Sequence, residues 1–283
     1  MAKAPRAYEN LDFLNSPAAR AIRVECEMIE PAFRLYPYGI HKTLVVFGSA
    51  RTPSKEDAET ALEALKKRLK EQPFSEDEKE EMLKRARQDV RNSVYYEAAR
   101  QLSYDLTKWT MEAFPQAADR FYICSGGGPG IMEAANRGAF EAGGKTLGLG
   151  IMLPYEQKLN PYISPTLSFD FRYFFVRKYW FLKLARALIA FPGGFGTMDE
   201  LFEMLTLVQT GKSGRKIPII LYGREFWESI IDFEKFYELG YISKEDLSDF
   251  IIVDSVDEAR EIIIREITEG GPLEGGPKPV GEL

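Results

Sequence analysis

The chain has 283 residues, of which 45% are hydrophobic and 28% charged, and its formal net charge is −6. This length and apolar content allow one large domain or two small ones around a sizeable core. The acidic balance argues against nucleic acid or an anionic membrane as the main partner, because both require a basic face. A small anion needs only a few local cations and backbone N–H groups, so an anionic small molecule stays a candidate ligand.

Few residues of the metal-binding and nucleophilic types are present. Cys26 and Cys124 lie far apart outside any CxxC pair, and His41 is the single histidine. We therefore expect no metal site and no Ser-His-Asp triad, which leaves acid–base chemistry to carboxylates, Lys, Arg or Tyr. No apolar run of about twenty residues could span a bilayer, and the first residues lack a secretory signal, so we expect a cytoplasmic protein.

The first part of the chain precedes the regular α/β pattern. Residues 1–41 form an N-terminal extension with one predicted helix at 17–29, and residues 42–47 form a buried strand. A helical insertion follows at about 54–114, in which Ser75 and Glu78 have the spacing of a capping box at the start of the second helix. We interpret its dense charges as a solvated face on the outside of the domain.

Strand-like runs and amphipathic helices alternate in the rest of the domain, which extends from 42 to 269. Such alternation predicts a doubly wound, Rossmann-like α/β fold, with a parallel sheet covered by helices on both faces and ligands at the carboxyl ends of the strands. The Gly- and Pro-rich residues 270–283 are predicted to be a flexible tail. Strands are predicted at 120–124, 147–151, 168–171, 188–191, 217–222 and 251–253, and helices at 131–142, 174–185, 198–209, 226–239 and 256–269.

A first glycine loop runs from Gly126 to Gly130, after a strand and before a helix. In this position backbone N–H groups and the helix dipole can bind a phosphate, and glycines let the backbone approach it closely. Pro129 suits the first turn of the helix. The alternative is a tight turn in which the glycines supply positive φ and bind nothing.

A second glycine loop contains Gly193, Gly194 and Gly196, between another strand and helix at the same predicted edge. It has neither the Lys-Ser or Lys-Thr of a Walker loop nor the GxGxxG spacing, so ATP hydrolysis and NAD-linked hydride transfer lose support. Thr197 and Glu200 are candidate site residues here. They also have the spacing of a capping box, in which they would only cap their own helix.

Residues 192–200, Pro-Gly-Gly-Phe-Gly-Thr-Met-Asp-Glu, match the PGGxGTxxE signature of the Lonely Guy (LOG) phosphoribohydrolases, long mislabelled as lysine decarboxylases. Residues 126–133 and the pair Arg177-Lys178 resemble the family's phosphate loop and its Arg-Lys pair. The resemblance covers roughly residues 42–255, and the extension and insertion resemble its longer bacterial branch. It implies hydrolysis of the N-glycosidic bond of AMP or a cytokinin riboside 5′-monophosphate, giving free base and ribose 5-phosphate.

The resemblance also assigns roles to residues. Glu200 matches the essential carboxylate and Arg177 the essential arginine, with Lys178 and Ser49 as further substrate-binding residues. Glu133 stands where compact members often have Gly, and receives no role beyond that of a partner for a cation. The resemblance implies no metal or cofactor. It does imply a homodimer or a larger homo-oligomer, and the helix that follows Ser75 is a candidate surface for that association. The phosphate would be held by Thr197 with Gly126, Gly127, Gly128, Gly130, Gly193, Gly194 and Gly196.

The chemistry agrees with these roles. Cleavage of an N-glycosidic bond develops an oxocarbenium-like charge on the ribose, which a carboxylate such as Glu200 can stabilise while it contacts the ribose or orients water. Arg177 does not readily give up a proton, but it can neutralise charge on the leaving base or position Glu200. No residue of the sequence is identified as the proton donor to that base.

Ordinary structural roles compete with these functional ones. Arg177 and Lys178 interrupt an apolar helix, where a structural ion pair is the usual explanation. The aromatic residues at 169–181 are predicted to be buried. For Phe174, Tyr179, Trp180 and Phe195, stacking on a nucleobase is the alternative to a place in the core.

Three other classes of protein remain as alternatives. Molybdenum-cofactor carriers have a similar fold and bind a phosphorylated pterin, but they have no need for the Arg177 and Glu200 pair. DNA-binding relatives resembling DprA are disfavoured by the acidic balance. A lysine decarboxylase would require a Schiff-base lysine, and no motif identifies one.

Overall fold

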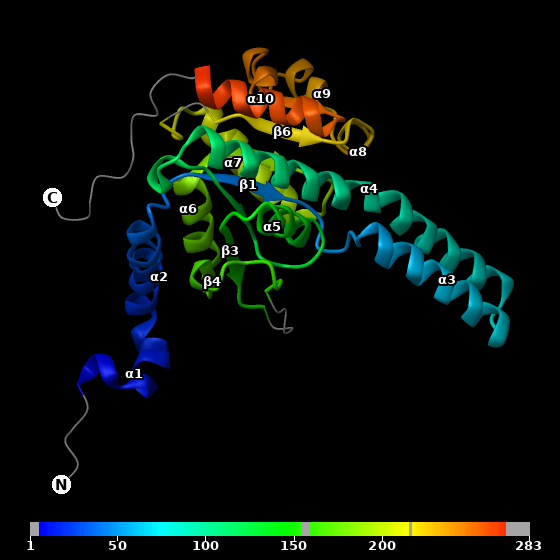
Figure 1. The fold of residues 1–283 in the computed structure, drawn as a ribbon, viewed down its shortest axis with the longest axis horizontal. Coiled ribbons are helices and arrows are strands. Elements are labelled where there is room, and N and C mark those ends of the chain that lie inside the picture. Colours follow the sequence, from blue (N-terminus) through cyan, green and yellow to red (C-terminus); the bar gives the residue numbers. More distant parts are fainter. Residues whose placement is uncertain (1–5, 154–158, 215–216, 270–283) are drawn as a thin grey trace, which may run out of the picture.

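A computed structural model describes residues 6–153, 159–214 and 217–269, so the predicted tail at 270–283 lies outside the described residues. Its centre is a parallel sheet in the order β4-β3-β2-β1-β5-β6-β7 (Figure 1). The doubly wound α/β fold predicted from the sequence is therefore confirmed. The strands are β1 (Thr43–Phe47), β2 (Tyr122–Ser125), β3 (Thr146–Ile151), β4 (Ser168–Phe171), β5 (Ala185–Ala190), β6 (Ile219–Tyr222) and β7 (Phe250–Val253).

The strand order reverses at β1. The chain builds outward from β1 through β2, β3 and β4, then returns to the other side of β1 with β5. Val45 of β1 is accordingly in register with Cys124 of β2 on one side and Leu188 of β5 on the other. The carboxyl ends of β2, β1 and β5 are therefore neighbours at the kind of switch point where α/β sheets bind ligands.

Helices cover both faces because the strands are apolar on both sides. In β1, Val45 and Phe47 belong to one core, and Leu44 and Val46 belong to the other. The first core is covered by α2 (Arg20–Leu35), α6 (Phe174–Leu184), α7 (Phe195–Gln209) and α8 (Arg224–Ile230), and the second by α4 (Glu76–Ala113), α5 (Ile131–Glu141) and α10 (Val256–Glu269).

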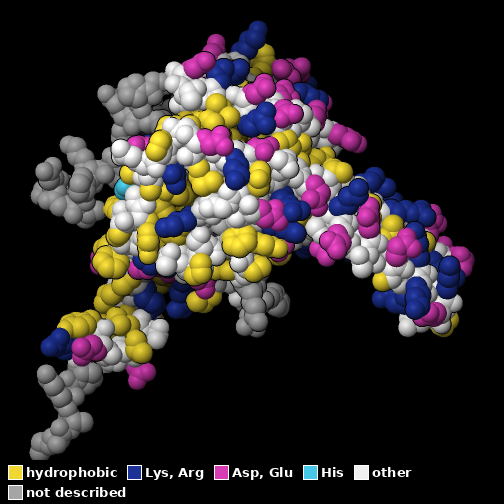
Figure 2. All heavy atoms as spheres, viewed as in Figure 1, with side chains coloured by type: hydrophobic (Ala, Val, Ile, Leu, Met, Phe, Trp, Pro, Cys, Tyr) yellow, Lys and Arg dark blue, Asp and Glu magenta, His cyan; other side chains and the backbone are white. Residues whose placement is uncertain are grey.

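Two parts project from the body of the molecule in Figure 1. One is formed by α1 (Leu11–Asn15) and part of α2, and the other by α3 (Lys55–Glu71) with the first half of α4. The second projection carries charges of both signs on its surface (Figure 2). The capping box between Ser75 and Glu78 is confirmed at the start of α4. The helical insertion was expected to lie on the outside of the domain, and α3 and the first half of α4 do so. The second half of α4 instead packs on the sheet through Tyr96, Ala99, Leu102 and Leu106.

The predicted elements differ from the structure mainly at their ends. β5 begins at Ala185 and α7 at Phe195, each earlier than expected. The single helix expected at 226–239 is divided into α8 and α9 (Phe233–Glu238), because the Asp232 side chain caps a new helix by accepting from the Lys235 N–H. Among the described helices, none is long and apolar enough to cross a membrane.

Candidate active site

The turn after β1 connects the two glycine loops. The backbone N–H of Ser49 donates to the carbonyl oxygen of Pro192 at 3.0 Å, and the Ser49 carbonyl accepts from the N–H of Ile131, also at 3.0 Å. One residue thus joins the loop before α7 to the first residue of α5. The expectation that the two loops lie at one edge of the sheet is confirmed, with Ser49 between them.

Close packing and backbone conformation explain the glycines of the first loop. Gly127 and Gly130 have φ values of 75° and 70°, which side chains rarely tolerate. A Cβ on Gly130 would collide with the carbonyl oxygen of Ser49, and one on Gly126 would lie 2.8 Å from the sulfur of Met132. A turn without a ligand would require small residues at these positions too.

A buried polar network supports the first loop from behind. The Asn160 side-chain amide donates to the carbonyl oxygens of Gly127 and Gly128, each at 3.1 Å, and to the side-chain oxygen of Asn136 at 2.9 Å. The Ser125 hydroxyl donates to the same Asn136 oxygen at 2.7 Å and accepts from the Gly127 N–H at 3.0 Å. The Gly127 N–H is therefore already occupied. Sequence analysis missed this network; a polar Asn136 among small apolar helix residues was its only signal.

The glycines of the second loop differ among themselves. A Cβ on Gly193 would overlap the side chain of Thr197, so packing explains that glycine. Gly194 and Gly196 do not have positive φ, and a Cβ on either would meet no described atom within 4 Å. Neither of the usual structural reasons for glycine applies to these two residues. Their backbone faces open space at the start of α7, where helix N–H groups have no partner within the helix.

Arg177 and Glu200 form a buried ion pair beside the first loop. Nη2 of Arg177 lies 3.2 Å from Oε1 of Glu200, and the two side chains are only 13% and 5% exposed. A Cβ on Gly126 would lie 3.8 Å from Nη1 of the same arginine. The ion pair therefore reaches the edge where the loops meet. Nε of Arg177 is buried and makes no hydrogen bond within the described residues.

The environment of the pair shifts both titration equilibria. Burial raises the pKa of Glu200 to about 7, although the positive charges of Arg177 and Lys178 act in the opposite direction. Burial also lowers the pKa of Arg177, an effect that Glu200 partly offsets. A carboxylate that titrates near neutral pH in a polar edge of a sheet is a candidate general base or charge stabiliser.

Thr197 and Glu200 do not form the capping box that their spacing allows. The helix begins at Phe195 with Gly194 as N-cap, which places Thr197 inside the first turn. Thr197 is buried against Gly193, and Glu200 bonds to Arg177. The local explanation for this Thr-x-x-Glu pair is therefore wrong.

Lys178 belongs to a neighbouring ion cluster. Its Nζ lies 2.7 Å from Oδ2 of Asp199 and 2.8 Å from Oε2 of Glu203. Although partial burial disfavours the charged form, these hydrogen bonds raise the pKa of Lys178 above its usual value. Lys178 therefore links α6 to α7. If it also contacts a substrate, it does so while paired with Asp199 and Glu203.

The prediction that the aromatic stretch is buried is only partly confirmed. Phe169, Phe171, Trp180 and Phe181 lie in the core, but other aromatic side chains of α6 are exposed, as is Phe195 at the start of α7. The reason is helical geometry, since one face of α6 packs on the sheet and the other does not. The exposed aromatic residues are Phe174, Phe175, Tyr179 and Phe195.

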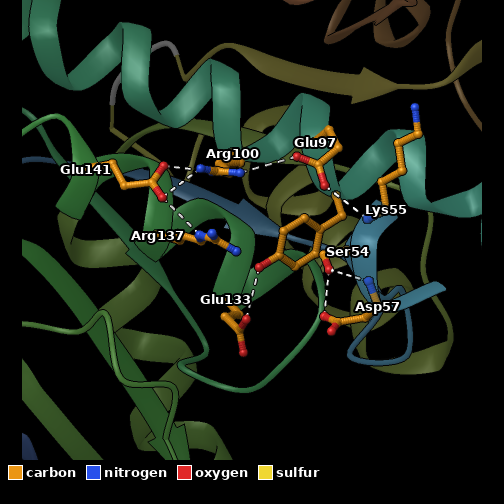
Figure 3. A network of polar contacts seen from close by, with 9 residues as sticks. Ser54, Lys55, Asp57, Glu97, Arg100, Glu133, Arg137 and Glu141 are labelled. Carbon is orange, nitrogen blue, oxygen red and sulfur yellow. Dashed lines mark hydrogen bonds and ion pairs between the residues drawn. The ribbon is translucent and has the colours of Figure 1, made fainter. Parts of the chain in front are cut away.

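The helix after the first loop is fixed to α4 by a polar network (Figure 3). Arg100 of α4 makes two 2.7 Å hydrogen bonds to Glu141, which also accepts from Arg137 of α5 at 2.9 Å. Glu133, in the first turn of α5, accepts from the hydroxyl of Tyr96 at 2.9 Å. Its hydrogen-bond partner there is thus a phenol, where a cation was expected. These contacts make the second half of α4 part of the support for the first loop.

Similarity to known proteins agrees with the signature. A family model described as "Possible lysine decarboxylase" matches residues 132–263, which contain Arg177 and Glu200. A rice protein (Oryza sativa subsp. japonica) named as a probable cytokinin riboside 5′-monophosphate phosphoribohydrolase, LOG4, is 26% identical over 149 residues, covering 52% of this chain and 62% of the rice protein. The match thus spans less than two thirds of that relative.

Two further similar proteins come from bacteria. The cytokinin riboside 5′-monophosphate phosphoribohydrolase of Mycobacterium marinum is 27% identical over 142 residues, covering 48% of this chain and 73% of the mycobacterial protein. Among solved structures, the molybdenum cofactor binding protein of Rippkaea orientalis is 20% identical with a TM-score of 0.40, covering 60% of this chain and 88% of that one.

Proposed function

Because the chain belongs to the Lonely Guy (LOG) family, we propose that it hydrolyses the N-glycosidic bond of a nucleoside 5′-monophosphate, with AMP or a cytokinin riboside 5′-monophosphate as substrate. The observation that carries the proposal is the buried pair of Arg177 and Glu200, 3.2 Å apart, at the edge where the glycine loops meet. A structural ion pair alone would not explain Gly194 and Gly196 shortly before Glu200, because neither glycine has positive φ or a crowded Cβ position.

The 5′-phosphate is held at the start of α7. Gly194 and Gly196 leave room for an anion to approach the backbone, and the first turn of the helix offers N–H donors and the positive end of the helix dipole. Thr197 lies in the same turn. Gly126, Gly128 and Gly130 of the first loop line the other side of the phosphate site. The N–H of Gly127 already donates to the Ser125 hydroxyl, so Gly127 shapes the loop and does not bind the phosphate through that group.

The reaction adds water across the bond between C1′ of the ribose and the base nitrogen. The hydroxyl group of water goes to C1′, the proton goes to the base, and the products are free base and ribose 5-phosphate. Ionised Glu200 stabilises the positive ribose or orients the water. Arg177 keeps Glu200 in place and balances its charge.

Product analysis tests this proposal. The protein is incubated with AMP, GMP, CMP, UMP and a cytokinin riboside monophosphate, and free base and ribose 5-phosphate are quantified. We expect turnover of at least one nucleotide, lost in Glu200→Gln and Arg177→Ala by factors of at least about 10² to 10³. Glu63→Gln, which removes an exposed charge paired with Lys66 on α3, is the matched control and should remain active. Near-normal rates in both site variants would refute the assigned roles.

The rival functions make different predictions in the same experiment. A carrier of a phosphorylated cofactor would bind nucleotides or pterins without releasing a base. A decarboxylase that forms a Schiff base needs a lysine with a depressed pKa. Lys178 of the signature pair instead has a raised pKa in a cluster with two carboxylates, which does not suit that chemistry.

The protein is proposed to form a homodimer or larger homo-oligomer. The two helices that carry Arg177 and Glu200, α6 and α7, also carry exposed aromatic side chains, with Phe195 96% exposed. Large exposed aromatic groups of this kind mark surfaces that bind a ligand or a partner chain. This face supports self-association more strongly than the charged start of α4.

A further inference from the structure

One residue of the N-terminal extension, Glu27 of α2, contacts the helix that carries Arg177 at its start and again past its middle. Its carboxylate oxygens accept hydrogen bonds from the backbone N–H groups of Arg172 at 2.9 Å and Tyr173 at 3.2 Å, where α6 begins. Its backbone carbonyl accepts from Nε1 of Trp180 at 3.0 Å. Residues far apart in sequence are thereby joined through a single position.

These contacts bracket Arg177. The carbonyl of Tyr173 accepts the backbone N–H of Arg177 at 3.1 Å, so the residue held by the Glu27 carboxylate is also the first hydrogen-bond partner of Arg177 within the helix. Trp180, about one turn further on, is fully buried in the core below the sheet. A continuous chain of hydrogen bonds therefore runs from Glu27 through Tyr173 to Arg177, and from Arg177 to Glu200.

The start of α6 depends on this carboxylate because α6 has no cap of its own. Its N-cap residue, Tyr173, makes no side-chain capping hydrogen bond. Glu27 accepts the N–H groups of the N-cap residue Tyr173 and of Arg172 before it, so it fixes the backbone where α6 begins, and a carboxylate at this end of a helix is favoured by the helix dipole. Without it, the first turn of α6 would be free to fray. Arg177 lies in the next turn, held to Glu200 by a single hydrogen bond.

We propose that Glu27 is a positioning residue of the active site, which holds the first turn of α6 so that Arg177 stays in contact with Glu200. The inference rests on the proposed function for its catalytic consequence. It assigns a role to the N-terminal extension: α2 is a structural part of the site. Besides Arg177, the described residues Lys178, Asp199 and Glu203 act electrostatically on Glu200, and these three lie on α6 and α7.

The first test measures the protonation of Glu200 without any substrate. Infrared difference spectra between each protein and its Glu200→Gln derivative give the pKa of this carboxyl as pH is varied. In Glu27→Ala, a more distant Arg177 should raise that pKa by about one unit, since a close opposite charge shifts a carboxyl by about 1 to 3. Glu25→Ala removes an exposed carboxylate of the same helix and should leave the pKa unchanged.

The second test measures turnover of the nucleotide that the wild-type protein cleaves. Glu27→Ala should lower kcat by about tenfold to 10²-fold with a smaller change in KM, because a misplacement of about 1 Å has costs of this size. Glu27→Gln keeps one carboxamide oxygen as acceptor and should restore part of the rate. In an Arg177→Lys background the same Glu27→Ala change should have little further effect, because coupled residues are not additive.

The two tests separate the two proposals. If no nucleotide is cleaved, the proposed function fails while the pKa shift still decides the role of Glu27. The role of Glu27 is refuted if Glu27→Ala matches Glu25→Ala in both the Glu200 pKa and kcat, or if its loss of rate is undiminished in the Arg177→Lys background. If Glu27→Ala does not fold, Glu27→Gln takes its place in each comparison, and a wild-type pKa and kcat in that variant would equally refute the role.

Discussion

Nη2 of Arg177 lies 3.2 Å from Oε1 of Glu200, although both side chains are almost entirely removed from solvent. Burial of a charged pair costs free energy, and the attraction between the partners recovers only part of it. The pKa of about 7 for Glu200 expresses this balance, since burial outweighs the arginine. A carboxyl group with a pKa of about 7 gains or loses its charge near neutral pH, so small changes around Glu200 alter the fraction that is ionised.

The rate should therefore depend on pH near neutrality. Glu200 is protonated, and cannot stabilise a positive ribose, below its pKa of about 7, so kcat/KM should rise with pH through that value and level off above it. The phosphate of AMP titrates near about 6. A phosphorothioate analogue has a lower second pKa than the phosphate, so it separates titration of the substrate from titration of Glu200. The midpoint of the pH profile stays near 7 with this analogue if it belongs to Glu200. A profile that follows the substrate would contradict the assignment.

Gly194 and Gly196 should be needed for activity and not for folding. Neither has positive φ or a crowded Cβ position, so Gly196→Ala should leave the free energy of unfolding unchanged or raise it slightly. The added methyl group would occupy the space of the anion and lower kcat/KM by at least about tenfold. Gly127→Ala provides the contrast, because its φ of 75° makes alanine costly for stability. Urea unfolding and steady-state kinetics measure both effects, and full activity in Gly196→Ala would refute close approach at α7.

Asn160 should support the first loop from behind. Asn160→Ala removes the side-chain donor to both carbonyls. Gly127 keeps the backbone N–H of residue 160 as a donor at 2.8 Å, but the Gly128 carbonyl loses its partner, which costs about 1 to 3 kcal/mol. We expect an increase in KM larger than the decrease in kcat, since the first loop, which is proposed to form one wall of the phosphate site, loses its shape. Asn92→Ala, at a residue whose side chain accepts from Gln88 on the projecting hairpin, is the control. Equal stability of the two variants in urea would show that the network is dispensable.

The sequence predicted the elements that position the site because the signals were local and strong. Apolar strands followed by glycine loops identified β2 and β5, and their place on either side of β1 brought the loops together. The Thr197 and Glu200 spacing misled because capping is a local rule, and α7 begins earlier, at Phe195. Tertiary structure then supplied Arg177 as the partner of Glu200, which the spacing alone could not reveal.

The supporting residues could not be predicted because each contact joins distant segments. Glu27 reads as one charge on an amphipathic helix, and only the packing of α2 beside α6 gives it the backbone of Tyr173 as partner. Asn160 lies in a stretch without periodicity, and its function depends on carbonyls in a loop that precedes it. Exposed aromatic residues of α6 were likewise predicted to be core, since composition does not tell which face of a helix meets the sheet.

Self-association should depend on the aromatic face of α6 and α7. We expect light scattering to give at least twice the chain mass of 32.2 kDa for the wild-type protein. Phe202 is a further exposed aromatic residue of α7, and Phe202→Glu should lower that mass toward the monomer. Phe236→Glu on α9, at a site of nearly equal exposure (39% for Phe202 and 38% for Phe236), should not. An unchanged mass in Phe202→Glu would direct attention to the start of α4.

The most direct test of the central claim compares a nucleotide with the same nucleoside lacking its 5′-phosphate. If the second loop grips the phosphate while Glu200 acts on the ribose, kcat/KM for AMP, or for the preferred nucleotide, should exceed that for its nucleoside by at least about 10²-fold, since remote binding energy is used at the reacting centre. Cleavage of nucleoside and nucleotide with equal kcat/KM would contradict the account.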